Sequence, residues 1–151
     1  MTLIRRLGIV TGIVWALPNT LVGLLLGAAG MAGGARVAWR ERDLAVEFAH
    51  FPWGPGRALT LGNCILHTGA SLDVECGLYA PVSGCDTFAR PLLADHERAH
   101  VLQYMLLGPF FLPVYLACGG ISARNPFERA ADRYALTGFG WWPWTDAIRT
   151  R

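Results

Sequence analysis

Residues 95–104 read Asp-His-Glu-Arg-Ala-His-Val-Leu-Gln-Tyr, and the rest of the chain is interpreted outward from this stretch. Asp95 can serve as an N-cap, so we expect a helix to begin there. Residues four apart share one face of a helix, which brings the imidazoles of His96 and His100 within reach of one metal ion. Glu97 then stands beside the metal and can accept a proton from water. The motif predicts a metal site on a helix.

A zinc site needs a third protein ligand, and Glu128 is the best candidate. It opens the stretch Glu-Arg-Ala-Ala-Asp on a predicted helix that has Asn125 as N-cap and Pro126 as its first residue. Glu128 and Asp132 share one helical face, so Glu128 can bind the metal while Asp132 accepts a hydrogen bond from a ligand histidine. The alternative is a capping box, in which Glu128 bonds only the backbone of Asn125. The upstream histidines favour ligation.

The apolar stretch 101–123, between the proposed ligands, is long enough to cross a bilayer as a helix. A straight span would place His100 and Glu128 on opposite sides of a hydrocarbon core about 30 Å thick. Both residues must, however, lie about 2 Å from one metal ion. The break at Gly108-Pro109 offers a solution, because it can fold the stretch into two short arms.

Charge balance favours a span instead. Residues 34–98 carry 6 arginines and 8 acidic residues, whereas residues 1–6 and 124–151 each have a net charge of +2. Two spans with both ends in the cytoplasm would produce this pattern. We weight the metal geometry more heavily and predict that residues 101–123 fold back.

The N-terminal region predicts a membrane helix. Arg5 and Arg6 precede an uncharged run, residues 7–35, which exceeds the ~20 residues that a span needs. The two arginines predict a cytoplasmic N-terminus. The alternative is a signal peptide cleaved near the small residues 28–30, but the apolar region of such a peptide is only about 7–15 residues long. We expect a retained membrane segment, either kinked at Pro18 or split there into two shorter helices.

Composition agrees with a membrane location. Of the 151 residues, 53% are hydrophobic and 16% are charged, and the mean hydropathy is +0.34. Soluble domains have about 45–50% apolar and about 25% charged residues. This composition excludes a disordered chain, and a net charge of +2 argues against a nucleic-acid partner. The expected partner is membrane lipid.

The strands are predicted between residues 35 and 67. Two short alternating runs, 36–40 and 44–48, are separated by a charged turn and predict a hairpin. Residues 51–56 contain prolines and glycines and predict a loop. Residues 59–66 predict another strand, with Gly62 at a bulge or a close approach.

These patterns predict an α+β fold. The N-terminal hydrophobic membrane segment is residues 1–34, and a single metal-binding domain follows over residues 35–151. Within that domain, we expect a small hairpin and strand region over residues 35–67. We expect helices over residues 95–137, which carry the HExxH and ExxAD motifs.

The four cysteines form no CxxC pair, which argues against a structural zinc knuckle. Cys64 and Cys118 lie in apolar runs and are expected to be buried thiols. Cys76 and Cys85 flank a turn-rich loop and can close a disulfide if this loop meets an oxidising compartment.

Other polar residues carry weaker signals. His50 and His67 are expected to be loop residues rather than additional ligands or oxyanion donors. Tyr104, Arg133 and Tyr134 can each meet a substrate carbonyl, and nothing in the sequence selects among them.

The HExxH helix followed by a Glu-x-x-Ala-Asp helix resembles the gluzincin metallopeptidases, in particular their membrane-bound members. The chain also resembles small uncharacterised bacterial HExxH membrane proteins over about residues 58–135. It is far shorter than the membrane-bound gluzincins and has no second membrane hairpin of normal length between the ligands. The resemblance implies that Zn²⁺ is bound by three ligands, that Glu97 is the base and that Asp132 supports a histidine. The implied ligands are His96, His100 and Glu128.

The resemblance further implies a zinc-dependent peptidase at the bacterial cell membrane, with a peptide or protein substrate. Water activated by the metal would attack the peptide carbonyl after losing its proton to Glu97. The alternative is a non-enzymatic small integral membrane protein or a metal-binding scaffold.

Overall fold

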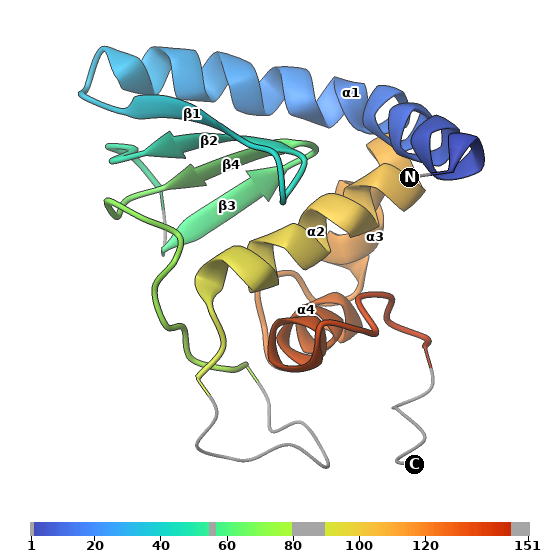
Figure 1. Cartoon of the computed structure of the whole chain (residues 1–151). Helices are drawn as coiled ribbons and strands as arrows, with labels where there is room; N and C mark the ends of the chain where they lie inside the picture. The colour runs from blue at the N-terminus through green and yellow to red at the C-terminus, as the bar shows by residue number, and fades with distance from the viewer. Residues whose placement is uncertain (1, 55–56, 80–89, 146–151) are drawn as a thin grey trace.

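The structure is a computed structural model that describes residues 2–54, 57–79 and 90–145, and it has the predicted mixed α+β fold (Figure 1). Its elements in chain order are α1 (Leu3–Met31), β1 (Arg36–Arg40), β2 (Ala45–Ala49), β3 (Ala58–Leu61), β4 (Cys64–His67), α2 (Leu93–Leu107), the 3-10 turn η1 (Gly108–Phe110), α3 (Phe111–Ala117) and α4 (Pro126–Thr137). The predicted N-cap Asp95 is wrong. Helix α2 begins earlier, after Leu92, and Asp95 pairs with Arg42.

The four strands form one sheet in the order β1-β2-β4-β3. β1 and β2 form the predicted antiparallel hairpin, and β2 pairs in parallel with β4. The single strand predicted over residues 59–66 is wrong, because the chain turns at Gly62 and Asn63 and forms a β3–β4 hairpin. Gly62 has a φ of +62°, and a Cβ there would lie 2.2 Å from the Thr20 hydroxyl oxygen. The turn therefore requires glycine.

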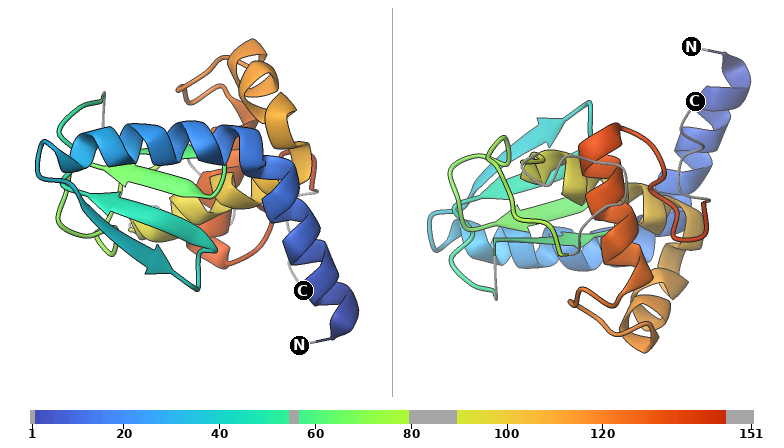
Figure 2. Two further views of the ribbon diagram at one scale, coloured as in Figure 1. Left: turned by 90° about the horizontal axis from the view of Figure 1, so that it is seen from above. Right: turned by 90° about the horizontal axis from the view of Figure 1, so that it is seen from below.

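Helices cover both faces of the sheet (Figures 1 and 2). Successive strand residues point to opposite faces. On one face, Phe48 and Cys64 pack against α1. On the other face, Thr60 bonds to Glu97 of α2. α4 packs on α2 away from the sheet, so α2 lies between β3 and α4 and can present residues to both.

Helix α1 is a single helix of 29 residues that contains Pro18 and bends along its length (Figure 2). Its outward side chains are large, apolar and exposed, and its length and composition would allow it to cross a membrane. Its buried face consists of small residues that permit close contact with the sheet and α2: Gly12, Ala16, Thr20, Gly23, Gly27 and Gly30. The N-terminal segment therefore shares its core with the sheet.

Gly27→Ala is expected to destabilise the fold by about 1–3 kcal/mol. A Cβ at Gly27 would lie 2.3 Å from the ring of Phe48, which is buried and has little room to move. Gly8→Ala is the matched control on the same helix, because nothing lies within 4 Å of its Cβ position. Thermal unfolding in detergent measures both variants. Equal melting temperatures would contradict the close packing of α1 on the sheet.

The second apolar stretch turns back on itself. α2, η1 and α3 together also have the length and composition to cross a membrane. The chain bends at Gly108, whose φ is +57° and whose missing Cβ would lie 2.5 Å from the Trp15 indole nitrogen. After α3 the chain returns, and α4 packs against α2. His100 and Glu128 lie side by side, as the fold-back prediction requires.

Candidate metal centre

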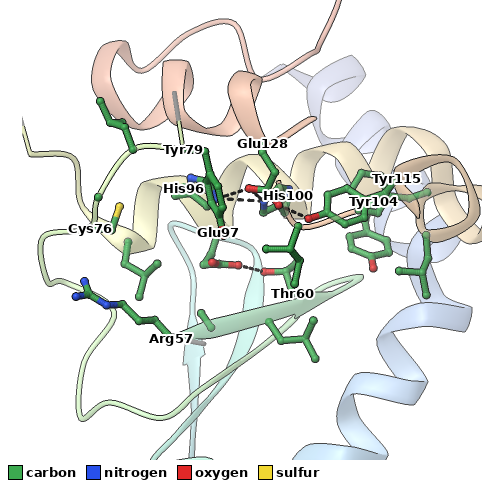
Figure 3. Close-up of a pocket in the computed structure, with 18 of the residues that line it drawn as sticks. Arg57, Thr60, Cys76, Tyr79, His96, Glu97, His100, Tyr104, Tyr115 and Glu128 are labelled. Atoms are coloured by element: carbon green, nitrogen blue, oxygen red, sulfur yellow. Dashed lines mark hydrogen bonds and ion pairs between the residues drawn. The ribbon is translucent and has the colours of Figure 1, made fainter. Parts of the chain in front are cut away.

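The two histidines of α2 meet the glutamate of α4 in the interior (Figure 3). The Nε2 atoms of His96 and His100 are 3.2 Å apart. Oε2 of Glu128 lies 3.1 Å from Nε2 of His96 and 3.5 Å from Nε2 of His100. All three side chains are buried, and together they could hold a metal ion. The fold thus brings together the three ligands proposed from the sequence.

His96 is oriented by Asp132, the residue predicted to support a histidine. Nδ1 of His96 lies 3.2 Å from Oδ1 of Asp132, one turn beyond Glu128 on α4. The other carboxylate oxygen, Oδ2, accepts a 2.6 Å hydrogen bond from the backbone N–H of Tyr79. The ring of Tyr79 lies beside the imidazole of His96, with centroids 5.8 Å apart. Asp132 therefore links His96 of α2 to the loop that carries Tyr79.

His100 is oriented by Gln103, which the sequence analysis missed. Nε2 of Gln103 donates to the carbonyls of Phe127 at 3.2 Å and Trp141 at 2.8 Å. Its Oε1 is then the atom that accepts from Nδ1–H of His100, at 2.8 Å. This tautomer leaves a lone pair on Nε2, the nitrogen that faces Glu128. The position three residues after His100, on the same helix face, was the signal that could have found Gln103.

Glu128 faces the histidines and does not form the capping box. The side chain of Asn125 caps α4 by accepting a 3.0 Å hydrogen bond from the backbone N–H of Phe127. The backbone N–H of Asn125 donates to the carbonyl of Ser122. Oε1 of Glu128 accepts a hydrogen bond from the hydroxyl of Tyr115, which leaves Oε2 toward the imidazoles. Burial raises the pKa of Glu128, but its contacts with His100 and His96 outweigh burial and hold this pKa far below its usual range. The residue is a carboxylate.

Glu97 is held by the sheet. The hydroxyl of Thr60 on β3 donates a 2.6 Å hydrogen bond to Oε2 of Glu97, and both residues are buried. Glu97 is not in the ligand cluster, but it lines the same pocket. The sequence could not identify Thr60, because its contact with Glu97 depends on how α2 crosses the sheet.

The cluster opens into a cavity of about 580 Å³ whose two ends differ in chemistry (Figure 3). Arg57 and Cys76 lie at one end, and Tyr104 and Tyr115 lie at the other. The side chains contributed by α3 and the turn after it are mainly apolar: Phe111, Leu112, Leu116 and Ile121. β3, an edge strand of the sheet, forms one wall through Ala58, Leu59 and Thr60.

The local field is negative. Burial together with Glu128 and Glu97 raises the pKa of Tyr79 to about 12. Burial together with Asp132 and Glu97 raises the pKa of Cys76 to about 11. Both groups are therefore protonated at neutral pH. A divalent cation bound there would offset the negative charge of Glu128, Glu97 and Asp132.

Most of the weaker candidates lie elsewhere. His67 is not a loop residue, because it is buried in β4, where its Nε2 lies 2.7 Å from Oε1 of Glu47. His50 is exposed in a turn with a φ of +55°. Arg133 donates to the carbonyls of Gly140 and Trp142. Of the three residues considered for a substrate carbonyl, Tyr104 is the one among the pocket-lining residues.

The cysteines take no part in the ligand cluster. Cys64 is a buried thiol, as predicted, while Cys118 is half-buried. Cys76 carries a free thiol in the structure. Cys85, its proposed partner, lies outside the described residues, so the conditional disulfide stays a prediction.

In comparisons with protein-family models, with curated proteins and with solved structures, no match to this chain was found. What the site can do therefore follows from its own residues. Three buried side chains could together hold a metal ion, and the carboxylate of Glu97 lines the same cavity.

Proposed function

We propose that this protein is a membrane-associated zinc metallopeptidase. The observation that carries the proposal is the spacing of the three ligand atoms, which lie 3.1–3.5 Å apart. A tetrahedral zinc ion with bonds of about 2.0–2.1 Å separates its ligand atoms by roughly 3.3–3.4 Å. Two imidazoles and one carboxylate also leave a fourth position open, as hydrolytic zinc sites do. Zinc bound there would polarise a carbonyl and lower the pKa of water.

Glu97 is the proton acceptor in this proposal. Thr60 fixes Oε2 of Glu97 by a hydrogen bond, so Oε1 is the oxygen that receives the proton from the attacking water. Glu97 can then give this proton to the leaving amine, which needs it in order to depart. Tyr79 remains protonated beside His96 and is a hydrogen-bond donor at the cavity wall.

A polypeptide fits this cavity better than a compact small molecule. β3 is an outer strand that lines the cavity, so its outer edge offers backbone groups to an extended chain. A peptide added along β3 would pass in front of α2, where Thr60 meets Glu97. The apolar wall from α3 would receive its side chains.

The membrane location is supported by α1. This helix is long and apolar enough to span, and Arg5 and Arg6 at its start suit the cytoplasmic side. Its exposed side chains would otherwise present a large apolar surface to water.

Metal removal tests the proposal. Detergent-purified protein should hold about one zinc per chain and cleave peptides from a mixed library. Chelation should abolish cleavage, and added zinc should restore it. His96→Asn should lose both zinc and activity. His50→Asn is the matched control, because His50 is exposed outside the site and asparagine tolerates its positive φ. Zinc without any hydrolysis would instead support a metal-binding scaffold.

A further inference from the structure

The segment between the ligand helices exposes apolar side chains around a sharp bend. We name residues 105–121 the elbow; it comprises the end of α2, η1, α3 and the following turn. Phe110 is 60% exposed, Leu116 61% and Ile121 64%. No Asp, Glu, Lys, Arg or His occurs between His100 and Arg124. A water-facing bend of this length would ordinarily carry charges.

The elbow packs against the N-terminal half of α1, which carries no charged residue beyond Arg6. The rings of Trp15 and Phe110 have centroids 6.1 Å apart. A Cβ at Gly12 would lie 2.9 Å from Cε of Met105, so the two helices are in close contact. Trp15 and Phe110 are both exposed, so the apolar surfaces of α1 and of the elbow meet at this contact.

Two asparagines satisfy carbonyls at the bends of the elbow. The side-chain amide of Asn19 donates to the carbonyl of Gly108 at 3.1 Å, where the helix breaks. Asn125 donates to the carbonyls of Tyr115 at 3.1 Å and Gly120 at 2.7 Å, where α3 ends. In water these carbonyls would need no protein donor. In hydrocarbon, a broken helix is tolerated only when neighbouring groups supply the missing hydrogen bonds.

The elbow is too short to cross a bilayer. α3 has 7 residues, or about 10 Å at 1.5 Å per residue, against a hydrocarbon core of about 30 Å. Arg98 precedes the elbow and Arg124 follows it, and the contact of His96 with Glu128 keeps both ends on one side.

We propose that the elbow inserts into the bilayer hydrocarbon as a re-entrant element packed on α1, and that it leaves on the side from which it enters. Lipid covers its apolar surface. Leu116 and Ile121 belong both to this surface and to the cavity lining, so the cavity opens at the lipid surface. A polypeptide entering at that end arrives from the membrane. The proposal rests on the membrane location of the proposed function and is independent of hydrolysis.

Site-directed spin labelling of the full chain tests the insertion. Single cysteines at Val10 of α1, Phe110 and Leu116 of the elbow, and Val74 of the aqueous control loop are all exposed positions. They are placed in a background without the four native cysteines that keeps the wild-type melting temperature. The protein is reconstituted in phosphatidylcholine–phosphatidylglycerol vesicles. Oxygen should relax the labels at Val10, Phe110 and Leu116 more strongly than a water-soluble nickel chelate does, and the order should reverse at Val74.

Each other outcome overturns the proposal in a distinguishable way. If the nickel chelate relaxes the labels at Phe110 and Leu116 more strongly, while oxygen does so at Val10, then α1 lies in the membrane and the elbow does not. Nickel access at all four positions refutes the membrane location as well. Protection of the elbow labels from both reagents, relieved by diluting the protein in lipid, assigns the surface to a second copy of the chain.

Sidedness supplies a second measurement. Arg90→Cys and Arg124→Cys lie shortly before the two ligand helices and remove no ligand. A membrane-impermeant thiol reagent should label both from the same side of sealed vesicles. Labelling from opposite sides would show that residues 101–123 cross the bilayer and would overturn both the elbow and the shared metal site.

Discussion

Glu97→Gln is expected to leave the zinc content unchanged and to lower peptide hydrolysis by roughly 10²–10⁴-fold. Glu97 lies outside the three-residue ligand cluster, so its replacement removes no ligand atom. The glutamine oxygen can still accept the hydrogen bond that Thr60 gives to Oε2. The amide cannot, however, take a proton from water near neutral pH. The variant thus removes one proton-transfer step and keeps the shape of the site.

Zinc analysis and steady-state kinetics on the same preparation separate binding from turnover. Glu75→Gln is the matched control, because the Glu75 side chain is 60% exposed and pairs only with Arg90 among the ion pairs described. It should match wild type in both measurements. Full activity in Glu97→Gln would place the base elsewhere. Loss of zinc in that variant would mean that Glu97 holds the helix geometry instead.

The ligand cluster was predictable because its parts are local. His96 and His100 meet through helical spacing alone, and Glu128 with Asp132 repeats that spacing on a second helix. Excluding the capping box needed the structure, in which the backbone N–H of Asn125 donates to the carbonyl of Ser122 and not to Glu128.

The partners of these residues were not predictable, because they come from distant elements. Thr60 reaches Glu97 from a strand, and Tyr115 reaches Glu128 from α3. His67 pairs with Glu47 across the parallel contact of β2 and β4. Such contacts depend on the order of the strands in the sheet, and the period of the hydrophobic pattern along the sequence carries no information about that order.

The fold was predictable in class and less so in detail. The apolar length of the N-terminal run indicated a helical membrane segment, kinked or split at Pro18, but not that it would form one helix packed on a sheet. The spacing of Gly23, Gly27 and Gly30 along one helix face was the available signal for that contact. The strand expected over residues 59–66 became two, because Gly62 approaches α1 and turns the chain.

Glu128→Gln is expected to weaken zinc binding by more than roughly 100-fold, beyond the 10–100-fold loss that is usual for an outer hydrogen-bond partner. The contacts of Glu128 with His100 and His96 hold its pKa far below the usual range, and it is the one carboxylate among the three proposed ligands. The amide would keep the side-chain volume and a hydrogen bond to Tyr115. Helix α4 should remain folded, because Asn125 caps it independently of Glu128.

Asp132→Asn is the matched control for Glu128→Gln. Asp132 contacts Nδ1 of His96 rather than the metal position, so its loss should weaken zinc binding by about 10–100-fold only. Competition with a chromophoric chelator measures both affinities, and circular dichroism checks the helices. If the two variants lose equal affinity, Glu128 only supports the site and the ion has two protein ligands. Two ligands rarely retain zinc, so the metallopeptidase proposal requires the larger loss at Glu128.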